Sequence, residues 1–246
     1  MSLRVTTATA RRVLLQLRHD PRTVLLLVAV PCALVALLKY VFAGGQAGAV
    51  FDRVGGPLLG VFPLVSMFLV TSIAMLRERT TGTLERLLTM PLAKLDLLVG
   101  YAVAFALAAA VQATLVSALA FGALDLHVRG PTWAVIVLAV ANAVLGMALG
   151  LFVSAFARSE FQAVQFMPAF VLPQLLLCGL LAPRQEMARP LEVVSWAAPL
   201  TYAYDALDRV TRGVYGGALV RDVLALVAFT LLALALGAVT LRRRTP

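Results

Sequence analysis

Six long apolar runs dominate the sequence and constrain its fold more than any other feature. They cover residues 23–42, 54–76, 97–124, 132–157, 161–183 and 223–241. A helix needs about 20 residues to cross a hydrocarbon core of roughly 30 Å, and each run is about that long. The runs therefore predict an all-α polytopic membrane protein with six transmembrane helices, a single membrane domain over 1–246. Lys39 lies near the end of the first run, where its amine can reach the membrane surface.

The composition agrees with a membrane protein and excludes an ordinary soluble domain. Of the 246 residues, 61% are hydrophobic and 13% are charged. The net charge of +9 comes from basic residues that flank the apolar runs, so we interpret it as a topology signal and expect no nucleic-acid partner. Cys32 and Cys178 both lie inside apolar runs, which favours packing residues over a disulfide or a metal pair.

The distribution of charge predicts the orientation of the chain. Segments 1–22, 77–96, 158–160 and 242–246 carry 13 Lys and Arg residues and 5 acidic ones, whereas the rest of the chain carries 8 basic and 7 acidic residues. Basic residues concentrate on the cytoplasmic side of membrane proteins. We therefore expect both termini and segment 77–96 in the cytoplasm of a bacterial-type cell, with the protein in its inner membrane and segment 184–222 outside.

The N-terminal segment 1–22 has no cleavage pattern of a secretory signal peptide. Plotted as a helix, it has an apolar side and, beside it, arginines that repeat every seven residues. The apolar side contains Leu3, Thr7, Ala10, Leu14 and Leu17, and the arginines are Arg4, Arg11 and Arg18. This pattern favours an amphipathic helix lying in the membrane interface, and a frayed basic tail is the alternative.

Segment 77–96 is the longest strongly charged stretch between two apolar runs. Gly82 is expected to end the preceding helix, and Thr83 is a candidate N-cap with Glu85 in the following first turn. Pro91 cannot continue that helix. The predicted short cytosolic helix has an apolar face made of Leu84, Leu87 and Leu88. Something outside this short helix must cover the face, and we expect it to be shared between other helices of the chain and a partner.

Segment 184–222 is too apolar for a free loop and too short for another span. We expect one or two short helices that dip into the outer leaflet. Its aromatic residues would lie near the lipid headgroups, and they are Trp196, Tyr202, Tyr204 and Tyr215.

Several kinds of chemistry are missing from the sequence. It contains no Gly-Lys dipeptide, so it has no Walker loop for ATP, and we predict neither enzyme activity nor a cofactor bound by this chain. His19 and His127 are predicted on opposite sides of the membrane, which excludes a zinc pair or a histidine-based catalytic site between them. The runs carry almost no ionisable residue at mid-depth, which argues against ion-coupled transport.

Mild polarity remains within the runs, at Ser66, Thr71, Ser72, Gln112, Thr114, Ser117, Asn142, Gln162, Gln165 and Gln174. Most of these side chains are expected to make interhelical hydrogen bonds. Alternatively, some of these polar side chains line a substrate path. The candidates for this role are Ser66, Thr71, Gln162, Gln165 and Gln174. Pro168 and Pro173 predict a bent fifth helix, either beside such a path or as a tolerated kink.

Four stretches, taken in their order along the chain, resemble a known family. The stretch RERTTGTLERLLTMP at 77–91 resembles the coupling region of permeases of ABC exporters of the second type. FARSE at 156–160, CGLLAP at 178–183 and APLTYAYDAL at 198–207 resemble the second half of the same family. The resemblance covers essentially the whole chain, and its nearest subgroup is that of daunorubicin-type, multidrug-like permeases.

The resemblance implies a permease that pairs with a second permease subunit, expected to be a second copy, and with two cytosolic ATPase subunits that bind ATP and Mg. The first, second and fifth spans would line the path between the permeases. Coupling to the ATPase is implied for Arg77, Glu78, Gly82, Thr83, Leu84, Glu85, Arg86, Leu87 and Leu88. An outer gate or re-entrant segment is implied around Gly179, Pro183, Trp196, Pro199 and Tyr202.

The sequence thus favours the permease subunit of an ATP-driven exporter for a hydrophobic or amphipathic, drug- or lipid-like substrate. Two alternatives stay open. One is an exporter of polysaccharide or lipid-linked glycan within the same superfamily. The other is a membrane scaffold that transports nothing and uses segment 77–96 to dock a cytosolic partner.

Overall fold

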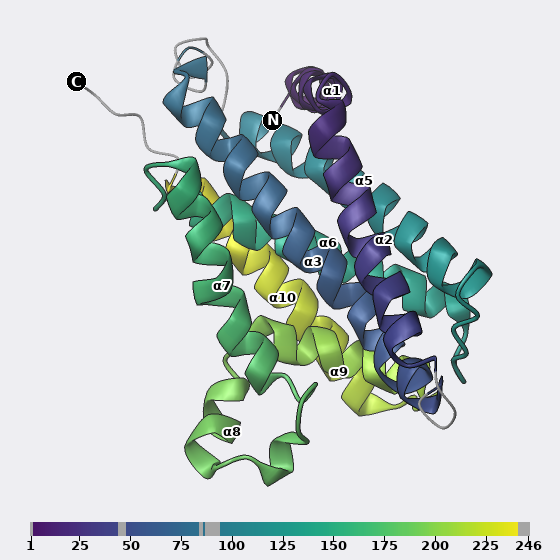
Figure 1. Cartoon of the computed structure of the whole chain (residues 1–246). Helices are drawn as coiled ribbons and strands as arrows, with labels where there is room; N and C mark the ends of the chain where they lie inside the picture. Colours follow the sequence, from purple (N-terminus) through teal and green to yellow (C-terminus); the bar gives the residue numbers. More distant parts are fainter. Residues whose placement is uncertain (1, 44–47, 84–85, 87–93, 241–246) are drawn as a thin grey trace.

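The computed structural model describes residues 2–43, 48–83, 86 and 94–240, and these form helices and turns without any strand. The helices are α1 (Leu3–Arg18), α2 (Pro21–Val41), α3 (Gly48–Thr80), α5 (Lys94–Gly122), α6 (Thr132–Val153), α7 (Glu160–Leu177), η2 (Arg184–Glu186), α8 (Arg189–Ser195), α9 (Pro199–Thr211) and α10 (Gly217–Thr240). The long helices form one bundle, with α1 at one end and α8 and α9 at the other (Figure 1). We call these the α1 end and the α9 end.

Among the described residues, five helices are long and apolar enough to cross a membrane. They are α2, α3 over Val50–Thr80, α5 over Leu95–Gly122, α6 and α10. The chain is therefore a multi-pass, all-helical membrane protein, as the apolar runs predict. The boundaries differ from the runs most clearly at α3 and α10. Helix α3 begins at Gly48, six residues before the predicted start at 54, and α10 begins at Gly217, six residues before the predicted start at 223.

The fifth apolar run forms α7, which is not one of these five helices. It lies in the same bundle and contacts α3 and α9. It is 18 residues long, and Glu160, three glutamines and two prolines reduce its mean hydropathy. The helix ends at Leu177, six residues before the end of the predicted span, and Gly179 turns the chain with a left-handed φ of 100°. A sixth span stays a prediction for α7.

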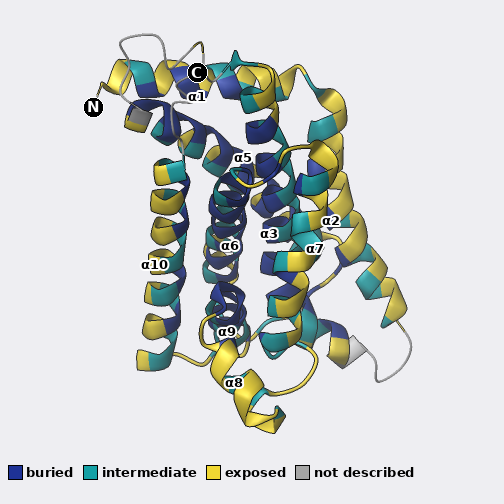
Figure 2. Ribbon diagram, turned by 90° about the vertical axis from the view of Figure 1, so that its left-hand side faces the viewer, coloured by how far each residue is buried: buried dark blue, intermediate teal, exposed yellow. Residues whose placement is uncertain are grey.

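The centre of the bundle is the contact between α3 and α6. Figure 2 shows α6 buried along most of its length, with α3 and α10 on either side. Gly146 and Gly150 form a Gly-x-x-x-Gly pattern on α6. A Cβ atom at Gly150 would lie 2.5 Å from the carbonyl oxygen of Phe68, and one at Gly146 would lie closer still to that of Leu64. The two backbones therefore touch, which only small residues permit.

Pro31 lies inside α2 and removes one backbone hydrogen bond, and a side chain of α5 supplies the missing donor. Proline has no N–H, so the carbonyl of Leu27 loses the donor that residue 31 would supply in a regular helix. The side-chain Nε2 of the buried Gln112 on α5 donates a hydrogen bond of 2.8 Å to this carbonyl. The expected interhelical role of Gln112 is confirmed. Asn142 has a similar role, since its Nδ2 donates to the carbonyl of Ala203 on α9 at 3.4 Å.

Helix α1 lies across the α1 end of the bundle, as Figure 2 shows. Leu3 and Thr7 of its predicted apolar side are exposed on the chain, and their contact with the membrane interface stays a prediction. The buried side consists of Thr6, Thr9, Ala10 and Val13. Helix α5 approaches α1 closely here, since a Cβ at Gly100 would lie 2.6 Å from that of Thr9. Small hydroxyl side chains fit this contact better than leucines do.

Segment 184–222 contains the short helices that its apolar character predicts, but α9 is not a lipid-facing element. Nine of its residues are buried, including Leu200 and Leu207. They lie against α3, α6, α7 and α10 of the same chain. The apolar side chains of α9 therefore complete the core at this end. The depth of the helix in the outer leaflet stays a prediction. Tyr204, expected at headgroup level, is buried with it.

The α3–α6 contact predicts that Gly146→Leu destabilises the protein. The added side chain has no room beside the carbonyl of Leu64, so we expect the free energy of unfolding to fall by about 1–3 kcal/mol. Thermal unfolding in a maltoside detergent measures the effect. Gly122→Leu is the matched control, since a Cβ at Gly122 has no neighbour within 4 Å. Equal unfolding temperatures for the two variants would contradict the prediction.

The bond from Gln112 to Leu27 predicts a coupled pair of substitutions. Gln112→Leu leaves a buried carbonyl unpaired and should cost about 1 kcal/mol of stability. Pro31→Ala restores a backbone N–H at position 31, so the same Gln112 substitution should cost clearly less in that background. A double-mutant cycle of unfolding free energies measures this coupling. The same cost in both backgrounds would show that Gln112 does not replace the missing donor.

Candidate functional site

The candidate site is at the α1 end, where the charged stretch that starts at Arg77 leaves the bundle. The sequence places Arg77 outside the second span, but α3 continues as a helix to Thr80. The hydroxyl of Thr81 donates to the carbonyl of Arg77 at 2.8 Å and pairs one of the last carbonyls of the helix. Gly82 then turns the chain with a φ of 71°, as its predicted role requires. Arg77 and Glu78 are therefore fixed on a helix.

Arg77 ties the end of α3 to the beginning of α7. Its Nε lies 2.7 Å from Oε1 of Glu160, and its second nitrogen lies 3.1 Å from Oε2. Glu160 is in the first turn of α7, whose N-cap Ser159 accepts a hydrogen bond from the amide of Gln162. Both charged side chains are about half exposed, so the pair contributes at most about 1 kcal/mol. Its main effect is the two-point alignment of α3 with α7.

Glu78 is turned toward the inside of the chain. Its carboxylate lies 3.3 Å from a guanidinium nitrogen of Arg12 on α1, and only 12% of its side chain is exposed. Arg12 also donates to the hydroxyl of Tyr101 on α5 and lies over its ring at 5.6 Å. The three side chains join α1, α3 and α5. The carboxylate of Glu78 is therefore engaged within the chain, and its predicted role in binding a partner stays a prediction.

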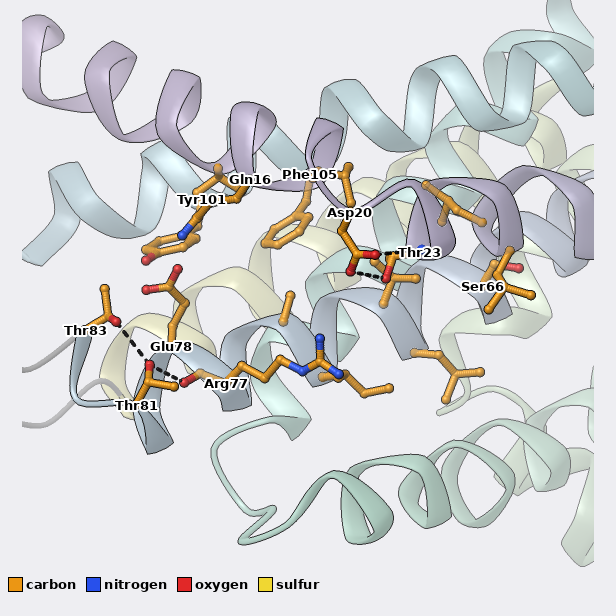
Figure 3. A pocket seen from close by; sticks show the side chains of 18 of the residues that line it. Gln16, Asp20, Thr23, Ser66, Arg77, Glu78, Thr81, Thr83, Tyr101 and Phe105 are labelled. Atoms are coloured by element: carbon orange, nitrogen blue, oxygen red, sulfur yellow. Dashed lines mark hydrogen bonds between the residues drawn. The ribbon is translucent and has the colours of Figure 1, made fainter.

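A cavity of about 590 Å³ lies next to these contacts, between α1, α2, α3 and α5. We call it the α1–α3 cavity. Figure 3 shows Asp20, Arg77 and Glu78 among its polar lining. Its apolar lining includes Leu26, Val30, Leu69, Val70 and Ile73. The cavity has the size of sites that hold drug-sized molecules and combines a charged part with an apolar body.

Asp20 is the N-cap of α2 and is held in place by Thr23. Its carboxylate accepts hydrogen bonds from the Thr23 hydroxyl at 2.6 Å and from the Thr23 amide at 3.2 Å. These bonds lower the pKa of Asp20 below its ordinary value, so the group is ionised at neutral pH. The sequence analysis missed Asp20 and Arg12. An Asp-Pro pair followed by Thr23 is a helix-start signal that would have indicated the cap.

The predicted coupling residues are only partly described. Arg77, Glu78, Gly82 and Thr83 lie together at the end of α3, where the Thr81 and Thr83 hydroxyls are 3.0 Å apart. The amide of Arg86 donates to the carbonyl of Gly82 at 3.0 Å. The predicted apolar helix face and its acidic first turn lie outside the described residues, and they comprise Leu84, Glu85, Leu87 and Leu88. Their coupling role stays a prediction.

Of the five candidate path residues, one lines the α1–α3 cavity and four do not. Ser66 lines the α1–α3 cavity. Thr71 is buried in α3, and Gln162 accepts from the amide of Arg158 at 2.8 Å. Gln165 is exposed on α7, and Gln174 accepts from the amide of Leu200 at the start of α9. A path formed by these side chains would need a second subunit.

Trp196 organises the predicted outer gate residues at the α9 end. Its ring lies between two guanidinium groups, those of Arg184 at 4.8 Å and Arg221 at 5.5 Å. The hydroxyl of Tyr202 donates to its carbonyl at 2.8 Å. Pro199 starts α9, while Gly179 and Pro183 lie in the turn that leads to η2. The implied outer gate residues are thus neighbours in space.

Buried ion pairs at the α9 end were missed by the sequence analysis. Arg184 pairs with Asp205, and the fully buried Asp222 pairs with Arg209 at 2.9 Å and with Arg221 at 2.8 Å. Only the Tyr-Asp-Ala-Leu run pointed to this region. Within the described residues, no group of His, Cys, Asp and Glu side chains could hold a metal ion.

Comparisons with known proteins agree with this arrangement. The chain is 28% identical over 153 residues to the probable multidrug ABC transporter permease YbhR of Escherichia coli K12, a match that covers 62% of this chain and 42% of that protein. It is 27% identical over 146 residues to ABC transporter G family member 20 of Dictyostelium discoideum, covering 59% of this chain and 20% of that protein. The chain thus spans less than half the length of either relative.

The profile of the ABC-2 type transporter family matches residues 4–210. This region runs from α1 through nearly all of α9 and includes the α1 end and the short helices of the α9 end. Because the match covers most of the chain, the protein belongs to the ABC-2 type transporter family.

Proposed function

We propose that this chain is the permease subunit of an ATP-driven exporter. It would pair with a second permease subunit, expected to be a second copy, and with two separate ATPase subunits that bind ATP and Mg. Family membership carries this proposal, and the missing Walker loop requires that the ATPase be another chain or domain. The relatives are described as a multidrug permease and an ABC transporter of the G family, which supports the same class.

The proposed orientation puts the α1 end in the cytoplasm and the α9 end outside the inner membrane. The excess of basic residues in segments 1–22, 77–96, 158–160 and 242–246 supports this orientation. The ATPase would then meet segment 77–96. Arg77 and Glu78 begin this segment, and their ion pairs join α3 to α7 and to α1.

The proposed mechanism transmits a rigid-body motion. ATP-dependent closure of the ATPase pair displaces segment 77–96, and α3 follows because it is one helix of 33 residues from that segment to the α9 end. Backbone contact makes α6 move with α3, and the Arg77–Glu160 pair makes the start of α7 follow. The movement would reach α9, which contacts α3, α6 and α7, and would open the outer side.

The proposed cargo is a hydrophobic or amphipathic small molecule. The α1–α3 cavity of about 590 Å³ suits such a molecule better than a polysaccharide chain. The other alternative, a scaffold that transports nothing, has no structural feature in its favour and is separated from export by the assay below.

Transport measured with the copurifying ATPase tests this function. In vesicles that contain the complete complex, we expect ATP-dependent movement of a fluorescent amphipathic dye. A partner ATPase with an inactivated nucleotide site should abolish this movement while the complex still assembles. Unchanged movement in the inactive complex would contradict ATP-driven export. Assembly without any transport of dyes or lipids would favour the scaffold.

Coupling through segment 77–96 predicts that Glu85→Lys weakens binding of the ATPase at least tenfold. The substitution reverses a charge in the segment that family resemblance assigns to the contact, and insertion of the spans should not change. Copurification of the ATPase at matched permease levels measures the effect. Glu186→Lys makes the same charge change on an exposed residue at the α9 end and is the control. Normal copurification with the Glu85 variant would count against this contact.

A further inference from the structure

The α1–α3 cavity has charged and apolar parts that suggest a particular ligand. Asp20 and Glu78 contribute carboxylates to its polar part, and Arg77 lies between them on the wall formed by α3 (Figure 3). The apolar part continues along α2 and α3, between Leu26 and Val30 on one side and Val70 and Ile73 on the other. A ligand that fits both parts has one charged group and an apolar body.

The charge balance of the polar part is negative. Both carboxylate oxygens of Glu160 engage Arg77, and Arg12 pairs with Glu78. Asp20 has no basic side chain within ion-pair distance in the described part of the chain, and its hydrogen-bond partners are both groups of Thr23. Counted together, these five ionised groups leave one negative charge. Arg77 attracts Asp20 from beyond ion-pair distance, and Asp20 is the one of the three carboxylates that makes no ion pair in the described residues.

The carboxylate of Asp20 is also fixed in position. Two hydrogen bonds from Thr23 hold it at the start of α2, so little side-chain freedom is lost when a cation binds. The same bonds keep it ionised at neutral pH. The phenyl ring of Phe105 lines the same cavity and offers an aromatic surface near the carboxylate end.

We propose that the α1–α3 cavity binds an amphipathic organic cation, with its charged group at Asp20 and its apolar body between α2 and α3. All the residues that line the site belong to one subunit and come from α1, α2, α3 and α5. An anion of the same size would meet the carboxylates of Asp20 and Glu78 instead. The inference rests on the proposed export function only for the fate of the cation after it binds.

Binding to the purified permease without ATPase tests the site directly. Tetraphenylphosphonium is the probe, and tetraphenylborate has nearly the same shape and the opposite charge. Equilibrium dialysis in maltoside detergent, which has no charged headgroup, should show saturable binding of the cation at one site per chain. The anion should bind at least tenfold more weakly.

Two substitutions probe the two parts of the cavity. Asp20→Asn removes the charge but keeps an N-cap residue of equal quality, so the helix start is preserved while affinity for the cation falls at least tenfold. Glu186→Gln makes the same change in net charge at the α9 end and should leave the affinity unchanged. Val70→Trp fills the apolar part and should reduce cation binding without a change in the charge of the site.

The outcomes separate this site from the export function. Equal binding of both ions, or wild-type affinity in Asp20→Asn at an unchanged unfolding temperature, would overturn the proposal. Displacement of the cation by phosphatidylethanolamine at low molar ratio would also overturn it in favour of a lipid site. None of these results concerns the ATPase. The converse result is a permease that binds the cation normally in a complete complex that transports nothing in the presence of ATP. That result would contradict the proposed export function and would not contradict the proposed cation site.

Discussion

The close contact between α3 and α6 is the constraint on which the rest of the structure depends. Gly146 and Gly150 let the backbone of α6 approach the carbonyls of Leu64 and Phe68, so the two helices form one unit at the centre of the bundle. Lipid chains are as apolar as leucine side chains, so association in the membrane relies on such close packing rather than on the hydrophobic effect. The remaining helices contact this unit or its extensions.

At both ends of the bundle, ion pairs position the helices that surround the α3–α6 unit. At the α1 end, Arg77 aligns α7 and Glu78 holds α1 and α5 through Arg12. At the α9 end, buried carboxylates pair with arginines from η2, α9 and α10. Buried pairs of this kind are costly to break singly, which makes them specific joints between helices. The apolar middle has almost none of these joints.

The sequence predicted what depends on local pattern. The apolar runs located five spans, Gly82 marked the end of α3, and Gln112 was correctly assigned to an interhelical bond. The features that the sequence did not predict depend on which helices pack against each other. The buried residues of α1 and α9 follow a helical period, but that period does not say which helices cover them, such as α5 at Gly100. The α1–α3 cavity was missed because Asp20 and Glu78 are far apart in the sequence.

We infer that α3 and α6 move as one body when the partner ATPase closes. Electron–electron distance measurements on the complete complex test this most directly, with spin labels at Thr80 on α3 and at the exposed Val137 on α6, and with Cys32 and Cys178 replaced. We predict that trapping ATP leaves the distance between these two labels within one subunit unchanged and shifts the distance between the Thr80 labels of the two subunits. A changed Thr80–Val137 distance within the subunit would contradict this inference.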